Sequence, residues 1–315
     1  MSLFLGIDTS NYTTSVALYD SDNERDISCK RLLPVKDGEL GIRQSDAVFH
    51  HTQQLPTLYN ELVKNISDLK NKITAIGVSE KPRPVEGSYM PCFTVGKGFA
   101  EVLGTTLGVP VYGLTHQQGH IVSALYSADK LCLLGERFIV FHVSGGTTEA
   151  LLVDEKMNIS LVAKTLDLNA GQAVDRVGFM LGCKFPCGKE LENIANGFNG
   201  KVRVKPTLKG SDCCLSGLQN ICKKMYDDNK SREEIAFYCL KYIEETIYKM
   251  VNFLKEKYGD IPFVFAGGVM SNKIIRDSLT KRISCTFAEP EYSTDNAVGI
   301  AYLAKVEWEN DTGTK

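Results

Sequence analysis

The sequence opens on Leu3-Phe-Leu-Gly-Ile-Asp-Thr-Ser10, followed by Tyr12-Thr-Thr-Ser-Val-Ala-Leu-Tyr19. The second half of the chain repeats this pattern in Phe138-Ile-Val-Phe-His-Val-Ser-Gly-Gly146 and Thr147-Thr-Glu-Ala-Leu-Leu-Val153. Each segment has two apolar runs joined by a turn rich in Gly, Ser or Thr, which predicts a β-hairpin whose turn exposes N–H groups and hydroxyls. Such a turn can serve as a turn alone, but two copies predict a duplicated domain with phosphate-type loops that face one cleft.

Strands and helices alternate along the rest of the chain, which predicts an α/β fold. Apolar residues at helical spacing predict helices over residues 46–66, 95–107, 232–257 and 295–308. Pro56 is expected to interrupt the first of these helices. We expect two domains, 1–118 and 119–294, the second with a helical insertion. Residues 295–315 are expected to form a helix with a frayed tail that packs back on the first domain.

The composition is that of an ordinary globular protein, with 315 residues of which 43% are hydrophobic and 23% charged. The net charge of −2 gives no global positive field, so a nucleic-acid partner has to be held by a local basic patch. The N-terminus lacks the basic region of a signal peptide, and no apolar run approaches the ~18 residues of a membrane span. We therefore expect a cytoplasmic protein that does not contact a membrane. The 10 cysteines form no C-x-x-C pair and are expected to be reduced core residues.

His116 and His120 lie in the segment Thr115-His-Gln-Gln-Gly-His120, and the chain has only 5 histidines. Residues four apart share one face of a helix, so both imidazoles can reach one metal ion; two surface histidines are the alternative. The spacing is that of the H-E-x-x-H motif of zinc peptidases, whose Glu acts as the general base. Gln117 stands at that position and cannot take a proton, so the pair indicates a metal site without peptide hydrolysis.

A third apolar strand, over residues 263–266, ends in Gly267-Gly-Val-Met-Ser-Asn272. A helix is expected to follow, with Ser271 or Asn272 as its N-cap. Glycines at a strand-to-helix turn let a ligand approach the backbone beside a helix N-terminus. Turn geometry alone is the alternative explanation for this glycine pair.

The order of these segments resembles the actin/sugar kinase/Hsp70 architecture. Within it the chain resembles the TsaD family of threonylcarbamoyl transferases, often named "O-sialoglycoprotein endopeptidase". The most specific features are the histidine motif and Ser293-Thr-Asp-Asn296 near the C-terminus. The other matching segments are residues 6–10, 143–146, 170–176, 215–218 and 266–269, with Asn272. This resemblance covers nearly the whole chain and implies two duplicated actin-like (ribonuclease H-like) domains with a nucleotide cleft between them.

The resemblance implies a metal site formed by His116, His120 and Asp295. Two histidines and one carboxylate with open positions suit one divalent metal, iron or zinc, and the open positions can bind a phosphate or carbonyl oxygen. Asp295 also stands where the last helix is expected to begin, so a role at the helix N-terminus is the other interpretation of this residue.

The resemblance also implies a site for ATP or an acyl-adenylate. It places the phosphates near Ser144, Gly145 and Gly146, the ribose near Asp175, and the adenosine near Gly188, Gly268 and Asn272. A carboxylate such as that of Asp175 can accept hydrogen bonds from the two ribose hydroxyls. For each glycine, turn geometry alone is the alternative.

Several positions depart from the family pattern. The first loop of the family carries an Asp and a Glu where this chain has Tyr12 and Thr13, and that Asp is proposed to assist the transfer. A phenol is a poor base at neutral pH, whereas the weakly nucleophilic amine of adenine benefits from a base, so no catalytic residue is assigned here. Glu86 lies in a segment where the family has Gly-Pro-Gly, and Thr147 and Gln172 replace a His and a Glu.

The reaction of the family moves threonylcarbamoyl from threonylcarbamoyl-AMP to N6 of an adenosine in tRNA, so the resemblance implies a metal-dependent transferase of this kind. Two alternatives stay open: a carbamoyltransferase with a different acceptor, and a non-catalytic subunit that binds nucleotide and metal. The implied partners are an adenine nucleotide or carbamoyl-adenylate, tRNA, and a related actin-like subunit or a second copy of the chain. Residues 50–66 match the part of the family that packs on such a subunit, which an exposed Phe49 or Tyr59 would favour.

Overall fold

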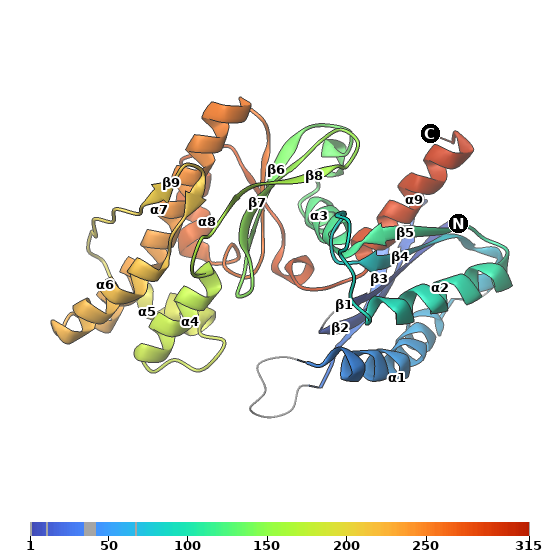
Figure 1. The fold of residues 1–315 in the computed structure, drawn as a ribbon, viewed down its shortest axis with the longest axis horizontal. Coiled ribbons are helices and arrows are strands. Elements are labelled where there is room, and N and C mark those ends of the chain that lie inside the picture. The colour runs from blue at the N-terminus through green and yellow to red at the C-terminus, as the bar shows by residue number, and fades with distance from the viewer. Residues whose placement is uncertain (1, 11, 35–41, 67, 315) are drawn as a thin grey trace. The chain divides into compact units, whose positions relative to one another are not determined.

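The computed structural model describes residues 2–10, 12–34, 42–66 and 68–314 (Figure 1). The chain forms two compact units: unit 1 comprises Met1–Ser127 with Asp295–Lys315, and unit 2 comprises Ala128–Thr294. Each unit is built around its own five-stranded sheet, which confirms the predicted α/β fold. The boundary expected after residue 118 falls inside helix α3 (His116–Ser127), whereas unit 1 continues to the end of that helix.

The sheet of unit 1 has the strand order β3-β2-β1-β4-β5. Its strands are β1 (Leu3–Ser10), β2 (Thr13–Asp20), β3 (Arg25–Leu32), β4 (Ile73–Lys81) and β5 (Val111–Thr115). The first three strands are antiparallel neighbours, and β1, β4 and β5 run parallel to one another. β1 and β2 are buried along their whole length, including polar residues such as Asp8, Thr14 and Asp20.

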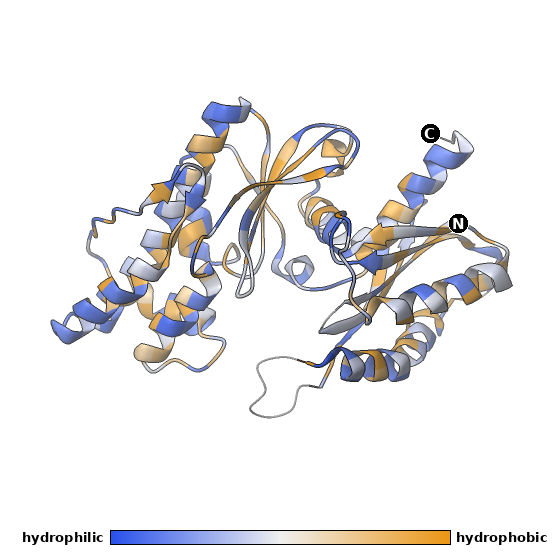
Figure 2. Ribbon diagram, in the orientation of Figure 1, coloured by the Kyte–Doolittle hydropathy of each residue, from blue (hydrophilic) through white to orange (hydrophobic). Residues whose placement is uncertain are grey.

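The helices of unit 1 are α1 (Gln44–Val63), α2 (Phe93–Leu107), α3 (His116–Ser127) and α9 (Val298–Thr312), with a short 3-10 helix at Leu69–Asn71. Hydrophobic and hydrophilic residues alternate along them (Figure 2). Side chains alternate between the two faces of β1. A Cβ on Gly6 would lie 2.3 Å from the carbonyl oxygen of Ala297, whereas a Cβ on Gly96 of α2 would lie 3.3 Å from Cγ2 of Ile7. Gly6 and Asp8 therefore face the α9 side of the sheet, and Ile7 faces α2.

Two details of the predicted helices are corrected by the structure. α1 continues through Pro56 to Val63, so the expected interruption is wrong. Leu55, Leu58 and Leu62 are buried along this helix, and their packing holds it together across the proline. The last helix begins at Val298 and extends to Thr312, so less of the tail is outside the helix than expected.

The sheet of unit 2 has the order β12-β11-β6-β7-β8. Its strands are β6 (Phe138–Val143), β7 (Thr148–Val153), β8 (Ile159–Lys164), β11 (Phe263–Ala266) and β12 (Thr286–Phe287). β6, β7 and β8 are antiparallel neighbours, and β6, β11 and β12 run parallel. Order and directions match those of unit 1, which confirms the predicted duplication.

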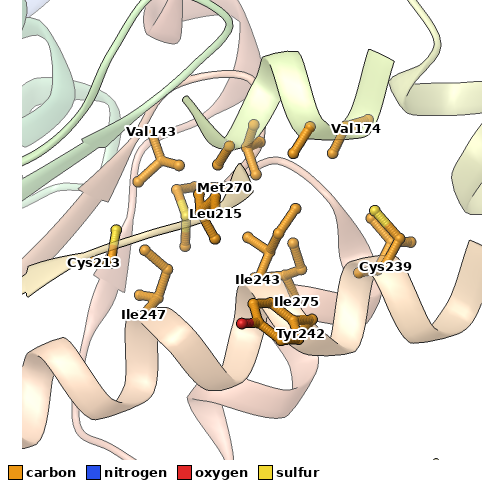
Figure 3. Close-up of a cluster of buried hydrophobic side chains, with 14 of the residues drawn as sticks. Val143, Val174, Cys213, Leu215, Cys239, Tyr242, Ile243, Ile247, Met270 and Ile275 are labelled. Carbon is orange, nitrogen blue, oxygen red and sulfur yellow. The ribbon is translucent and has the colours of Figure 1, made fainter. Parts of the chain in front are cut away.

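The remaining elements of unit 2 surround a large apolar core. They are α4 (Ala170–Met180), α5 (Gly188–Ala195), the hairpin β9 (Leu208–Lys209) and β10 (Asp212–Cys213), α6 (Ser216–Asp227), α7 (Arg232–Tyr258) and α8 (Lys273–Thr280), with 3-10 helices at Leu131–Leu133 and Pro290–Ser293. Figure 3 shows part of this core, where Ile243 and Ile247 of α7 lie among Leu215, Met270 and Ile275.

The ten cysteines are all unpaired, and most are buried or partly buried, as expected. Within the described residues, no helix combines the length and the apolar character needed to cross a membrane.

Candidate functional site

The predicted histidine pair lies at the start of α3, directly after β5. Thr115 and Gln118 fix this helix start through a reciprocal capping box: the Thr115 Oγ1 accepts from the Gln118 N–H at 3.2 Å, and the Gln118 Oε1 accepts from the Thr115 N–H at 3.0 Å. His116 is thereby the first helical residue, and His120 follows one turn later on the same face. The two imidazole rings are 4.3 Å apart, so the helical spacing brings them together as predicted.

Asp295 completes a three-residue set with the two histidines, although it lies 175 residues beyond His120 in the chain. Its Oδ1 is 3.1 Å from Nε2 of His120 and 3.6 Å from Nε2 of His116. One ligand atom from each residue lies within 4.8 Å of the others. All three residues belong to unit 1.

Close packing of α3 against α9 positions Asp295. A Cβ on Gly299 would lie 2.0 Å from the carbonyl oxygen of Gly119, so this crossing requires glycine. The Ser123 Oγ accepts from the Gly299 N–H at 2.9 Å and donates to Oδ1 of Asn296 at 2.8 Å. Asn296 also accepts a hydrogen bond from the Val298 N–H, so it is Asn296 rather than Asp295 that binds the N-terminus of α9. The Asp295 carboxylate faces the histidines instead.

The donor set fits a single divalent cation. Ligands bound at ~2.0–2.2 Å to one cation are themselves about 3–3.5 Å apart, which is close to the 3.1 and 3.6 Å that separate the Asp295 oxygen from the two Nε2 atoms. Two imidazoles and one carboxylate, with no thiolate, suit iron or zinc. Each of these three side chains is only partly buried, so a cation bound by them would stay accessible to a further ligand.

Asp8 orients the imidazole ring of His116 through the ring nitrogen Nδ1. Its Oδ2 lies 2.8 Å from Nδ1 of His116 and accepts from the Ser79 Oγ at 2.7 Å, while its Oδ1 accepts from the Ser10 N–H at 2.8 Å. A carboxylate bonded to one ring nitrogen of a histidine fixes the ring and leaves the other nitrogen for a metal. No local motif predicts this role, although a charged residue inside the apolar run 3–10 is a usable signal.

The charges of this cluster stabilise one another. Burial opposes ionisation of Asp8, but the charge and hydrogen bond of His116 outweigh it and lower the pKa of Asp8. Burial is likewise outweighed at Asp295, whose pKa is lowered by His120 and His116. For His116, burial favours the neutral ring, yet Asp8 and Asp295 raise its pKa to about 9. A metal that binds Nε2 at neutral pH therefore displaces a proton from His116.

Thr13, the first residue of β2, contacts Asp295. The Thr13 Oγ1 donates to Oδ2 of Asp295 at 3.1 Å. A second carboxylate here would repel Asp295, whereas the hydroxyl holds it. Tyr12 is 41% exposed, and its backbone carbonyl accepts from the Leu33 N–H.

A buried histidine lies next to this turn on the α1 side. The Oγ1 of Thr14 donates to Oε1 of Gln54 at 2.9 Å and is 2.8 Å from Nδ1 of His51. Because the hydroxyl proton goes to Gln54, Nδ1 of His51 is the donor to Thr14. Burial is the main cause that lowers the pKa of His51 to about 4, so the ring is neutral at physiological pH.

In unit 2, the turn between β6 and β7 contains Ser144, Gly145 and Gly146. The Ser144 N–H donates to the Thr147 carbonyl at 2.7 Å, and the Ser144 Oγ accepts from the Thr147 N–H at 3.2 Å. Both glycines are exposed, with open space where a Cβ would be. The turn therefore presents backbone to solvent, as a phosphate loop requires.

Helix α4 begins against this turn. A Cβ on Gly171 would lie 2.6 Å from Cα of Gly145, so the helix start and the turn are in direct contact. Asn169 caps the helix, and Gln172 closes the capping box by accepting from the Asn169 N–H at 3.3 Å. Gln can serve in this capping role as Glu does.

Two further predicted positions adjoin the same edge of the sheet. Gly267 has φ +99°, and a Cβ there would lie 2.4 Å from the carbonyl oxygen of Val143. Gly268 is exposed beside it, while Asn272 caps α8 through its bond from the Ile275 N–H at 3.1 Å. The carboxyl ends of β6 and β11 thus bring the Ser144 and Gly268 turns together, where α/β sheets bind ligands.

Asp175 and Gly188 are also brought together within unit 2. The Asp175 Oδ1 accepts from the Cys187 N–H at 2.9 Å, directly before Gly188, which begins α5 with open space at its Cβ position. One oxygen of Asp175 is therefore engaged by the backbone. The role of these residues in binding a nucleotide stays a prediction.

The sequence profile of the TsaD family, described as tRNA N6-adenosine threonylcarbamoyltransferase, matches residues 35–302. The chain belongs to the TsaD family. This confirms the resemblance carried by the histidine and Thr-Asp-Asn motifs.

Relatives of this name are similar along most of their length. The tRNA N6-adenosine threonylcarbamoyltransferase of Thermosipho africanus is 29% identical over 312 residues, which is 95% of this chain and 92% of that protein. The protein of the same name from Aromatoleum aromaticum is 30% identical over 313 residues, or 95% of this chain and 89% of that protein.

Solved structures share the fold at low identity. Full-length HypF in the phosphate- and nucleotide-bound form gives a TM-score of 0.60 at 13% identity; the match covers 100% of this chain and 47% of that one. A ROK family glucokinase from Streptomyces griseus in complex with glucose and AMPPNP gives 0.53 at 11% identity and covers 97% of this chain and 100% of the other. The actin/sugar kinase architecture is thereby confirmed.

Proposed function

We propose that this TsaD-family protein transfers a threonylcarbamoyl group from threonylcarbamoyl-AMP to N6 of adenosine in tRNA. The convergence of His116, His120 and Asp295 carries the proposal, because it supplies a metal-ligand set in a chain whose full-length relatives are named for this transfer. The relatives give no support to a different acceptor or to a subunit without activity.

The metal would be held by Nε2 of both histidines and by Asp295. When bound, iron or zinc supplies positive charge at open positions that can take a phosphate or carbonyl oxygen of the donor. Asp8, Ser79 and Thr13 keep the ligands oriented through their hydrogen bonds to His116, Asp8 and Asp295 respectively. This arrangement holds the donor, and the attacking amine of adenine comes from the tRNA.

The nucleotide part of the donor would be held by unit 2. The exposed backbone at Gly145 and Gly146 suits phosphate oxygens, and Oδ2 of Asp175 suits ribose hydroxyls. Gly188, Gly268 and Asn272 would line the adenosine. No residue is assigned as the base, since Tyr12 replaces the acidic residue of the family.

The proposed partners are tRNA and a related actin-like subunit or second copy. Phe49 of α1 is 58% exposed, which supports docking on this helix, whereas Tyr59 packs on Phe99 at 5.5 Å and belongs to the core. A cytoplasmic location stays a prediction.

Modified-nucleoside analysis of tRNA tests the function. In a strain whose gene is deleted, threonylcarbamoyladenosine should disappear, and it should return with the wild-type gene but not with Asp295→Asn. Asp277→Asn, which alters an exposed aspartate of α8, should restore it fully. Unchanged threonylcarbamoyladenosine after deletion would contradict the proposal. The purified Asp295→Asn protein should also lose stoichiometric metal, which is read by elemental analysis independently of activity.

A further inference from the structure

A strongly basic segment lies in unit 2, away from the turns described above in sequence. Residues 197–211 contain Lys201, Arg203, Lys205 and Lys209 but no Asp or Glu, on a chain of net charge −2. All four side chains are exposed, and none forms an ion pair with another residue that the structure describes. These four residues are called the basic strip; in Figure 1 they lie on the golden segment leading into β9 and on β9 itself.

Burial alternates along this segment. Val202 and Val204 are partly buried and Pro206 is buried, whereas Lys201, Arg203 and Lys205 between them are exposed. In an extended chain, alternate residues point to the same side and repeat about every 6.6 Å. The alternation therefore directs the three cations outward in a row, and Lys209 follows on the adjoining hairpin.

The segment is fixed to the core of unit 2. Val204 and Leu208 pack against the apolar core, and the ring of Phe198 lies 5.5 Å from that of Phe237. The Lys249 Nζ donates to the Pro206 carbonyl at 2.9 Å. The strip is thus held in place before any ligand arrives, which reduces the entropy that binding would cost.

Among the described residues, the carboxylate closest to the strip in sequence forms no ion pair with it. Asp212 stands opposite Lys209 in the β9–β10 hairpin, but its Oδ1 accepts from the backbone N–H of Lys164 at 2.8 Å. The segment also has no exposed large hydrophobic side chain. Binding to a membrane surface combines basic groups with inserted apolar ones, whereas a nucleic-acid backbone requires cations alone.

We infer that the basic strip binds the phosphate backbone of tRNA. The inference rests on the proposed transferase function, which makes RNA a substrate, and it adds the surface that holds this RNA. A protein of net negative charge needs such a local patch, because phosphate contacts supply most of the affinity for a nucleic acid. Since the contacts are to phosphates, the strip positions tRNA without reading its sequence.

Charge removal on the strip tests this inference. The full-length, metal-loaded protein is titrated against an unmodified tRNA transcript at several KCl concentrations, with fluorescence anisotropy as the readout. The triple variant Lys201→Ser, Arg203→Ser and Lys205→Ser should bind at least roughly tenfold more weakly at ~0.1 M salt. It should also lower the slope of log affinity against log salt by about 2 to 3. The matched control removes three scattered exposed lysines, Lys64→Ser, Lys156→Ser and Lys281→Ser, and should bind as the wild type does.

The outcomes separate the strip from the transfer reaction. Equal tRNA affinity and salt slope in wild type and triple variant would overturn the inference. It would also be overturned if anionic phospholipid vesicles bound through the strip as tightly as tRNA. A wild type that binds tRNA through the strip yet never forms threonylcarbamoyladenosine would leave the strip standing and contradict the proposed function. Normal transfer with an unchanged KM for tRNA in the triple variant would support the proposed function and overturn the inference that the strip binds tRNA. Metal content and circular dichroism of the variant verify that it is folded.

Discussion

The hairpin β1–β2 of unit 1 and the hairpin β6–β7 of unit 2 share one topology but carry different chemical groups. In unit 1, the end of β1 carries Asp8, which is fully engaged with His116, Ser79 and the backbone. In unit 2, the end of β6 leads into Gly145 and Gly146, which offer backbone rather than a carboxylate. The same framework thus positions a charged side-chain cluster in one unit and an exposed backbone turn in the other.

This difference indicates which contacts limit substitution in each unit. A buried carboxylate is tolerated only with partners in fixed positions, so unit 1 depends on contacts among β1, β4, α3 and α9. The unit 2 turn depends on small residues and on the helix start at Gly171. Substitutions should therefore act on metal affinity and folding in unit 1.

The largest expected effect is on folding of unit 1, where α9 touches the sheet through glycine. Gly6→Ala would place a Cβ 2.3 Å from the Ala297 oxygen and 2.5 Å from the Ala301 nitrogen. Overpacking against backbone should lower the free energy of unfolding by about 3 kcal/mol or more. Trp308, the one tryptophan of the sequence, packs on Phe4 at 5.9 Å and reports urea unfolding of this unit by fluorescence.

Gly98→Ala on α2 is the matched control for this substitution, because open space surrounds the position of its Cβ. It should leave stability unchanged or raise it by up to about 1 kcal/mol. If both variants unfold at the wild-type urea concentration, α9 does not approach β1 as closely as described.

Asp8→Asn separates orientation of His116 from direct metal binding. The variant keeps the size of the side chain but removes the charge that holds the imidazole, so zinc affinity should fall about 10- to 100-fold. Calorimetric titration against a competing chelator measures this, with Asp277→Asn as the control. Unchanged affinity would show that the ring is held without Asp8.

The pH dependence of stability should reveal His51. Its folded pKa of about 4 lies below the ordinary 6.5. The unfolded chain therefore takes up the proton first, and the stabilisation present above pH 6.5 is lost as pH falls toward 4. Between pH 7 and 5, His51 should account for a loss of about 2 kcal/mol in the metal-free protein. The loss is read as the difference between wild type and His51→Asn by Trp308 fluorescence in urea, because His116, whose folded pKa is raised, contributes in the opposite direction. The His51→Asn variant should lack this contribution to the pH dependence. If its free energy of unfolding changes as steeply with pH as that of the wild type, other groups cause the change.

The smallest effect is expected at Thr13, whose hydroxyl contributes a single hydrogen bond to Asp295. Thr13→Val should weaken zinc binding by roughly threefold to tenfold, as the loss of one hydrogen bond predicts. Thr13→Ser retains the donor and should bind as the wild type does. A Val variant with wild-type affinity would mean that Asp295 is positioned by α9 alone.

Local patterns made much of this molecule predictable. The hairpins, the shared face of His116 and His120, and the Asn272 cap follow from strand alternation, helical periodicity and capping chemistry within a few residues. Asp295 was predicted through the family resemblance, since nothing local links it to residues so far away. Local patterns also indicated the turns at residues 144–146 and 267–268 as ligand sites, whereas the family resemblance supplied Asp175 and Gly188.

The missed features depend on long-range contacts. Asp8 meets His116 across 108 residues, and Thr13 meets Asp295 across 282. Thr13 and Gln172 were interpreted as lost acidic groups, but the structure gives each a hydrogen-bonding role of its own. Such roles cannot be assigned before the partner across the fold is known.

The division of unit 1 has a consequence for biosynthesis. Unit 2 is encoded between α3 and Asp295, so a ribosome that has finished both histidines must still translate 175 residues before the carboxylate of their site exists. At 5–20 residues per second this delay is roughly 10 to 35 seconds. During that interval the nascent chain holds two histidines without their carboxylate and a sheet without α9. We expect unit 2 to be completed first on the ribosome, and the metal centre to be among the last parts of the protein to mature.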